Sequence, residues 1–128
     1  MTGDEAVVER SSPTLQELAT RLAQFASERD WDQFHSPKNL SMALAGEAGE
    51  LLEHFQWLTE AQSRDLPPDV REAVALEMAD VLLYLVRLAD TLAIDLAAAA
   101  DRKLALNAVK YPAGEFRGSA RKYDEPPR

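Results

Sequence analysis

The 128-residue chain contains no cysteine, which excludes a disulfide framework and a metal site built from thiolates. It also lacks a long uninterrupted apolar run, because the most apolar stretch, residues 81–100, is broken by Arg87, Asp90 and Asp95. The first ten residues, MTGDEAVVER, lack the basic and apolar regions of a secretory signal. These absences predict a soluble, cytoplasmic protein of one domain with no membrane partner.

Positive charge is scarce relative to negative charge. Fourteen Lys and Arg residues stand against 22 Asp and Glu residues, which gives a formal net charge of -8. Proteins that bind DNA or RNA gain much of their affinity by neutralising phosphates with basic side chains. The acidic balance therefore argues against a nucleic-acid polymer as partner, whereas a single phosphorylated metabolite remains compatible if metal ions screen the acids.

Four helical segments can be recognised, and no alternating strand pattern or hairpin signal competes with them. The predicted helices cover about residues 15–30, 37–57, 69–92 and 96–111. Residues of the type that cap helix starts precede three of them, namely Thr14, Ser36 and Asp95. We therefore predict an all-α, four-helix bundle-like domain over residues 13–112, with a flexible segment at 1–12 and a loosely ordered tail at 113–128.

The third predicted helix is apolar around nearly its whole circumference. Leu83 and Val86 lie on a different face from Val74 and Val81. Three other helices of one chain cannot easily cover all of this surface, so we expect another subunit to cover part of it. The sequence thus predicts a homo-oligomer.

Two pairs of acidic residues share one spacing. In ALEMADVLLYLV, residues 75–86, ten of twelve residues are apolar, yet Glu77 and Asp80 lie three apart on one helical face. The second predicted helix repeats the spacing with Glu47 and Glu50 in GEAGELLEH. Because a carboxylate loses several kcal/mol of hydration when it is buried, each of these groups needs a partner.

Divalent cations would cancel the repulsion among four such carboxylates. Ligation by oxygen alone suits Mg²⁺, or Mn²⁺, whereas zinc more often recruits His or Cys. Gly46 and Gly49 remove side chains beside the acids and would let a ligand approach closely. Since magnesium commonly shares its coordination sphere with substrate phosphates, the ligand set points to a nucleotide-like substrate.

Two other interpretations of the acids stay open at this stage. Arg87 and Lys103 could neutralise them in a buried ionic network, within a noncatalytic helical interaction domain. A ferritin-like di-iron site would use a Glu-x-x-His motif, but His54 follows Glu50 by four residues.

Aromatic and polar residues near the acids have the chemistry to contact a nucleotide: Trp31, His35, Lys38, Trp57, Tyr84, Lys103 and Asn107. Tyr84, for example, lies four residues after Asp80 and shares its helical face. Each also has a structural interpretation, because helical Tyr and Trp residues usually pack in a core and a Lys–Asn stripe is usually solvated. The acid pairs are what make stacking and phosphate binding worth considering.

The segment GEAGELLEHFQW, followed after a loop by ALEMADVLLYLVRLAD, resembles the all-α nucleoside triphosphate pyrophosphohydrolases of the MazG-like superfamily, with their E-x-x-E and E-x-x-D signature. Within that superfamily, the dCTP pyrophosphatase branch is similar in further segments: ERDWDQFHSPKNL, the Gln56-Trp57 pair, KYP at 110–112 and GSARKY near the end. The resemblance covers about residues 14–123. Some relatives carry a histidine on the first helix and an arginine at position 38, whereas this chain has no histidine there and has Lys38.

The resemblance implies hydrolysis of dCTP, or a related modified pyrimidine deoxynucleotide, to the monophosphate and pyrophosphate, in a homotetramer whose sites draw on more than one chain. It implies that magnesium is bound, and the reaction catalysed, by Glu47, Glu50, Glu77 and Asp80. It implies that Trp31, His35 and Trp57 line the base pocket, with Tyr84, Lys103 and Asn107 near the sugar and phosphates. Lys38 is a substrate-binding candidate because it lies at the start of the second predicted helix, where free backbone N–H groups favour anions.

Overall fold

The computed structural model describes residues 11–127, which form helices joined by turns, with no strand in that range. The elements are α1 (Leu15–Glu28), the 3-10 helix η1 (Asp32–Phe34), α2 (Pro37–Glu53), α3 (Glu60–Ser63), α4 (Pro68–Thr91), α5 (Leu96–Lys110) and α6 (Ala113–Phe116). The predicted all-α class is confirmed. Most of the predicted flexible segment 1–12 lies outside the described residues.

Side-chain caps start the helices where the sequence predicts. Thr14 accepts a hydrogen bond from the backbone N–H of Glu17 at 3.1 Å, and Asp95 accepts one from Ala98 at 3.0 Å. Ser36 caps α2 in the same way, with Pro37 at its first turn. The main difference is that α2 ends at Glu53, and turns rather than helix carry the chain on towards α3.

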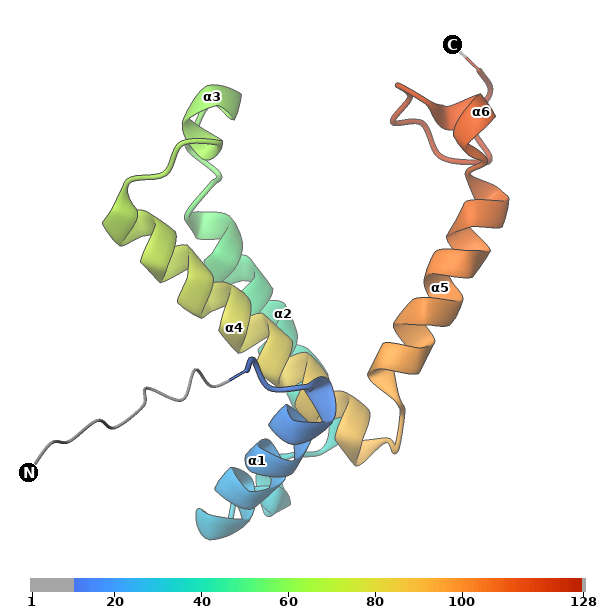
Figure 1. Cartoon of the computed structure of the whole chain (residues 1–128). Coiled ribbons are helices and arrows are strands. Elements are labelled where there is room, and N and C mark those ends of the chain that lie inside the picture. The colour runs from blue at the N-terminus through green and yellow to red at the C-terminus, as the bar shows by residue number, and fades with distance from the viewer. Residues whose placement is uncertain (1–10, 128) are drawn as a thin grey trace, which may run out of the picture.

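The helices α2 and α4 run antiparallel side by side, and α1 packs against α4 near its C-terminal end (Figure 1). The buried apolar side chains come from these three helices: Ala19, Ala26, Leu40, Val74, Val86 and Ala89. Five of the six are alanine or valine, so the helices approach closely but the core is thin.

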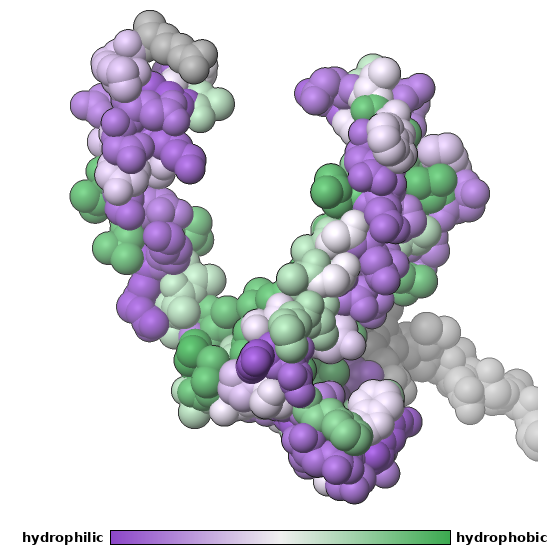
Figure 2. Space-filling view, turned by 180° about the vertical axis from the view of Figure 1, so that it is seen from behind, coloured by the Kyte–Doolittle hydropathy of each residue, from purple (hydrophilic) through white to green (hydrophobic). Residues whose placement is uncertain are grey.

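Helix α5 leaves this group and packs closely against no other helix of the described chain (Figure 1). The turn at Ala93, with a φ of 54°, redirects the chain before α5 begins. Within one chain the predicted four-helix bundle is therefore not closed. The physical reason is the turn at Ala93, which directs α5 away from the other helices, so that Leu104 and Val109 are 69% and 79% exposed. Apolar residues are visible on the surface of this arm, at the left of Figure 2.

The surface of the chain is large for its size. The accessible area is 10556 Å², whereas a compact monomer of 14.2 kDa exposes about 6,800 Å². In the described part of the chain, no helix combines the length and apolar character needed to cross a lipid bilayer. Exposed apolar side chains of α5, such as Leu104 and Val109, contribute to this surface.

The tail after α5 carries a small aromatic cluster. Tyr111 lies edge to face with Phe116 at 4.8 Å and with Tyr123 at 6.0 Å between ring centroids. The guanidinium of Arg121 lies over the Phe116 ring at 4.3 Å. These contacts give residues 111–123 local order. The predicted limits of the domain, residues 13 and 112, stay predictions.

Candidate active site

The antiparallel packing of α2 on α4 brings three of the predicted acids together. Carboxylate oxygens of Glu47, Glu77 and Asp80 lie within 4.8 Å of one another, and we call these three residues the acid cluster. Glu50, one helical turn after Glu47, shares a hydrogen bond with the Glu47 side chain but lies outside this group. His54 is not part of the cluster, so the Glu and His arrangement of a ferritin-like site is absent from these residues.

No basic side chain of residues 11–127 forms a salt bridge with the acid cluster. Loss of hydration raises the pKa of Glu47 to about 7, and the hydrogen bond with Glu50 and the charges of the other acids act in the same direction. One buried oxygen each of Glu47 and Glu77 has no hydrogen-bond partner. No salt bridge within residues 11–127 reaches these acids, so the predicted alternative of neutralisation by Arg87 and Lys103 is not what the structure shows.

The donor set fits a divalent cation bound through oxygen. Carboxylates are hard ligands of the kind that Mg²⁺ and Mn²⁺ prefer, and two of the oxygens are buried without any other partner. The space beside Gly46 and Gly49 is open, because a Cβ atom added at either position would meet nothing within 4 Å. Both glycines therefore lie on an open surface of α2.

A cavity of about 200 Å³ adjoins the acid cluster at Asp80, and we call it the aromatic cavity. The side chains that matter for its chemistry are Phe25, Trp31, His35, Asp80, Tyr84 and Arg87. Trp31 packs edge to face on Phe25, with 5.6 Å between centroids, and its ring is 6.2 Å from that of His35. Three predicted substrate-binding residues, Trp31, His35 and Tyr84, thus line one cavity that shares Asp80 with the acid cluster.

Arg87 also lines this cavity, a position that the sequence alone does not predict. Its side chain is 11% exposed and donates hydrogen bonds to His35 Nδ1 at 3.1 Å and to Asp32 Oδ1 at 2.7 Å. Burial lowers the pKa of His35, and the charge of Arg87 adds to this effect, while Asp32 opposes it. The signal that could have found Arg87 is its spacing, seven residues after Asp80 and three after Tyr84, which places all three on one face of α4.

Four other predicted residues do not reach the aromatic cavity in this chain. Trp57 lies past the end of α2 and is 87% exposed, and Lys38 is exposed in the first turn of α2. Lys103 and Asn107 lie on α5, the arm that extends away from the acid cluster (Figure 1). Their roles stay predictions.

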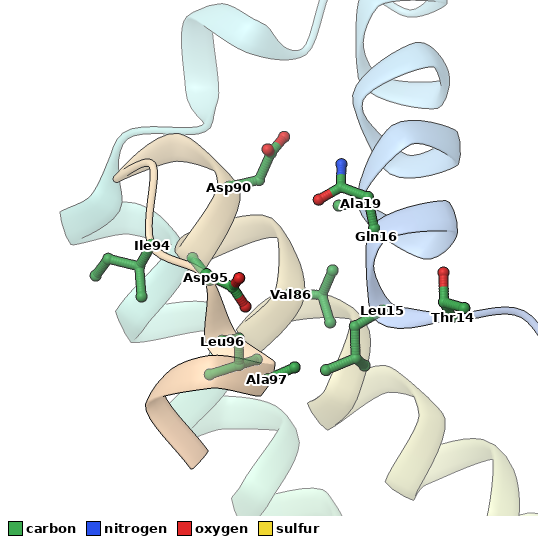
Figure 3. A pocket seen from close by; sticks show the side chains of 11 residues that line it. Thr14, Leu15, Gln16, Ala19, Val86, Asp90, Ile94, Asp95, Leu96 and Ala97 are labelled. Carbon is green, nitrogen blue, oxygen red and sulfur yellow. The ribbon is translucent and has the colours of Figure 1, made fainter. Parts of the chain in front are cut away.

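A second cavity, of about 330 Å³, lies where the start of α1, the end of α4 and the start of α5 meet (Figure 3). Leu15, Val86 and Ile94 line it, together with Asp90 and Asp95. Both carboxylates already have partners, because Asp90 pairs with Arg87 and Asp95 caps α5. This cavity therefore offers packing space rather than reactive groups.

Comparisons with known proteins agree with one another. A model of the MazG-like family matches residues 43–125. The dCTP pyrophosphatase 1 of Mus musculus is 48% identical over 118 residues, which cover 91% of this chain and 69% of the mouse protein. The dCTP pyrophosphatase 1 of Homo sapiens is 47% identical over 117 residues, covering 90% of this chain and 69% of the human protein.

A solved structure is also similar to this chain. The crystal structure of a pyrophosphatase from Archaeoglobus fulgidus matches with a TM-score of 0.68 and 36% sequence identity, covering 82% of this chain and 98% of the archaeal one. The family match includes all four predicted acids. The resemblance seen in the sequence is thereby confirmed, and the alternative of a noncatalytic interaction domain is not supported. The chain belongs to the MazG-like family and is a nucleotide pyrophosphatase.

Proposed function

We propose that this protein hydrolyses dCTP, or a related modified pyrimidine deoxynucleotide, to the monophosphate and pyrophosphate, with Mg²⁺ as cofactor. Such a reaction removes unwanted nucleotides from the cellular pool, and the cysteine-free composition suits the reducing cytoplasm in which we place it. The observation that carries the proposal is the junction at Asp80, where the acid cluster meets the aromatic cavity. The names of the mammalian relatives motivate the choice of dCTP.

The metal assignment follows from the donor set. Glu47, Glu77 and Asp80, joined by Glu50, would hold Mg²⁺, and Mn²⁺ could replace it. When bound, magnesium would neutralise negative charge on the triphosphate oxygens and lower the pKa of a water molecule. Glu47 or Glu50, whichever is less engaged in ligation, would accept the proton of that water. The water oxygen adds to phosphorus as the α–β anhydride breaks, which releases the monophosphate and pyrophosphate.

The base would occupy the aromatic cavity. Its volume of about 200 Å³ is below the ~300–1,000 Å³ typical of pockets for whole drug-sized ligands, so it suits one ring rather than a complete nucleotide. Trp31 and Tyr84 offer aromatic walls, and Asp80 links the cavity to the proposed metal site. A ring seated there leaves its triphosphate beside the acid cluster.

The active unit would be a homo-oligomer, a tetramer arranged as a dimer of dimers. A second copy that covers the apolar face of α5 would remove Leu104 and Val109 from water. The same contact could bring Lys103 and Asn107 of one chain to the acid cluster of another, where they would bind phosphate. Trp57, exposed in the single chain, could reach a base in the same way.

Product analysis tests the proposed function directly. The purified protein is incubated with each of the common deoxynucleoside triphosphates and Mg²⁺, and the products are separated by anion exchange. We expect dCTP to yield dCMP and pyrophosphate in equal amounts, and no reaction with excess EDTA. Release of dCDP and inorganic phosphate, or turnover of purine nucleotides only, would contradict the proposal.

A further inference from the structure

The strongest unassigned feature of the aromatic cavity is the bond between Arg87 and His35. Arg87 is fixed from three sides: Nε donates to His35 Nδ1 at 3.1 Å, and the two terminal nitrogens pair with Asp32 at 2.7 Å and with Asp90 at 3.5 Å. These partners come from η1, α2's preceding turn and α4 itself, and the guanidinium is almost fully buried among them. The arginine is therefore a fixed part of the cavity wall.

The direction of the Arg87–His35 bond determines where the imidazole proton lies. A guanidinium can only donate hydrogen bonds and does not lose its proton in proteins, so the nitrogen that faces it, Nδ1, must present its lone pair. A neutral imidazole carries one N–H, which then lies on Nε2. A second proton is disfavoured because burial and the adjacent positive charge both lower the pKa of His35.

The remaining donor of His35 is available to a ligand. The His35 side chain lines the aromatic cavity beside Trp31 and Tyr84. Within residues 11–127, the protein's hydrogen bonds engage His35 through its backbone N–H and its Nδ1 atom, and none uses Nε2. Nε2–H is thus the polar group that this side chain can still offer.

We propose that Arg87 is a positioning residue for base recognition, which holds His35 as the Nε2–H tautomer so that the cavity donates a hydrogen bond to a ring acceptor of a pyrimidine, N3 or O2. This step rests on the proposed function for the identity of the ligand. Arg87 acts through His35 rather than on the phosphates, because its guanidinium is engaged by His35, Asp32 and Asp90.

The tautomer can be measured without any substrate. The chain has only two histidines, so ¹⁵N-histidine labelling gives two imidazole patterns in a long-range ¹H–¹⁵N spectrum, and His54→Gln identifies the pattern of His35. We expect Nδ1 of His35 to be unprotonated in the wild type, and Arg87→Met to give mixed tautomers or a protonated ring. Asp90→Asn, which keeps the Arg87–His35 bond, is the matched control and should retain the wild-type pattern.

Kinetics then separate base recognition from a purely structural role. Arg87→Met should raise KM for dCTP roughly 2- to 12-fold, the range of one lost hydrogen bond, with the magnesium requirement unchanged. The same variant should show no change with an abasic deoxyribose triphosphate, which has no ring to accept the bond.

Three results would overturn the proposal: a wild-type His35 protonated on Nδ1, an unaltered His35 pattern in Arg87→Met, or an equal loss with dCTP and the abasic substrate. The first needs no variant, so it remains decisive if Arg87→Met fails to fold. Failure of the wild type to hydrolyse any nucleotide would instead overturn the proposed function, which the tautomer measurement does not depend on.

Discussion

The α2–α4 pair and helix α5 are both helical, but α2 and α4 pack against each other in the single chain and α5 packs closely against no other helix of the described residues. Leu40 of α2 and Val74 of α4 are buried in the core, and the same packing assembles the acid cluster. The 15-residue α5 instead leaves Leu104 and Val109 exposed and carries Lys103 and Asn107 away from the acids (Figures 1 and 2). The acidic residues of the proposed site thus come together within one chain, whereas α5, which carries the candidate phosphate-binding residues, does not pack beside them.

This difference has an energetic meaning. Unscreened carboxylates held close together oppose folding, as the raised pKa of Glu47 indicates, so the α2–α4 pair is a region that gains from a bound cation. Exposed apolar residues on α5 oppose solubility, so α5 gains from a protein partner. If one assembly provides both the bound cation and the protein partner, metal binding and assembly would depend on one another.

The largest effect is expected from removing one charge of the acid cluster. Glu77→Gln keeps the shape of the side chain but removes a proposed magnesium ligand, so turnover should fall by more than the roughly 10–100-fold typical of losing a residue that only supports a ligand. Because repulsion in the cluster is relieved, the variant should melt at the same or a higher temperature than the wild type in EDTA.

Glu72→Gln is the matched control, since Glu72 is exposed on the same helix, away from the cluster. It should keep wild-type turnover and stability. Near wild-type activity in Glu77→Gln would show that the acid cluster is not the metal site and that α2 and α4 only pack against each other.

The next effect concerns α5. Leu104→Asp places a charge on its apolar face, and sedimentation should show a smaller particle than the wild type, with activity lost in proportion. If α5 were simply solvated, a change at a side chain that is 69% exposed would alter the free energy of unfolding by only about 0.5 kcal/mol and leave the particle size alone.

Arg102→Asp puts the same carboxylate at an exposed polar position of α5 and serves as the control. It should sediment as the wild type does. A wild type that is an active monomer at micromolar concentration would end the proposed homo-oligomer.

Which elements the sequence could predict follows from how local their causes are. The caps Thr14, Ser36 and Asp95 act within one turn, so they marked helix starts well. The acid cluster was predictable because the three-residue spacing of its acids is a local feature of each helix, and both helices carry the same spacing. The direction of α5 was not, because it depends on the turn at Ala93 and on surfaces that the single chain leaves uncovered. The contacts of Arg87 could not be predicted, because its partners, Asp32 and His35, are more than 50 residues away in the sequence.

A moderate effect is expected at Trp57, which lies at the far end of the α2–α4 pair. If its indole stacks on the base in the assembly, Trp57→Ala should raise KM for dCTP about tenfold, since one stacking contact contributes about 1–3 kcal/mol. Its 87% exposure predicts little change in melting temperature. Phe34→Ala removes another exposed aromatic ring, 59% exposed and outside the aromatic cavity, and should leave KM unchanged. Equal KM values for Trp57→Ala and the wild type would confine base recognition to Trp31, His35 and Tyr84.

The smallest effect is a pH dependence of stability that arises at Glu47, in the α2–α4 pair. The pKa of Glu47 rises from 4.5 to about 7 in the folded chain, so between these values the native state binds more protons than the unfolded state. Without metal, this group therefore makes stability fall as pH rises from about 4.5 to about 7, after which its contribution is constant. The contribution of His35 to stability has the opposite sign, because its pKa is lowered from 6.5 and its contribution is lost as pH falls.

Melting curves of the wild type and Glu47→Gln in EDTA separate the contributions of Glu47 and His35, since His35 is common to both proteins. The difference between the two melting temperatures should widen in favour of Glu47→Gln as the pH rises, and saturating Mg²⁺ should reverse it by stabilising the wild type alone. Parallel curves at all pH values would mean that Glu47 titrates normally and that the acids of α2 and α4 do not interact.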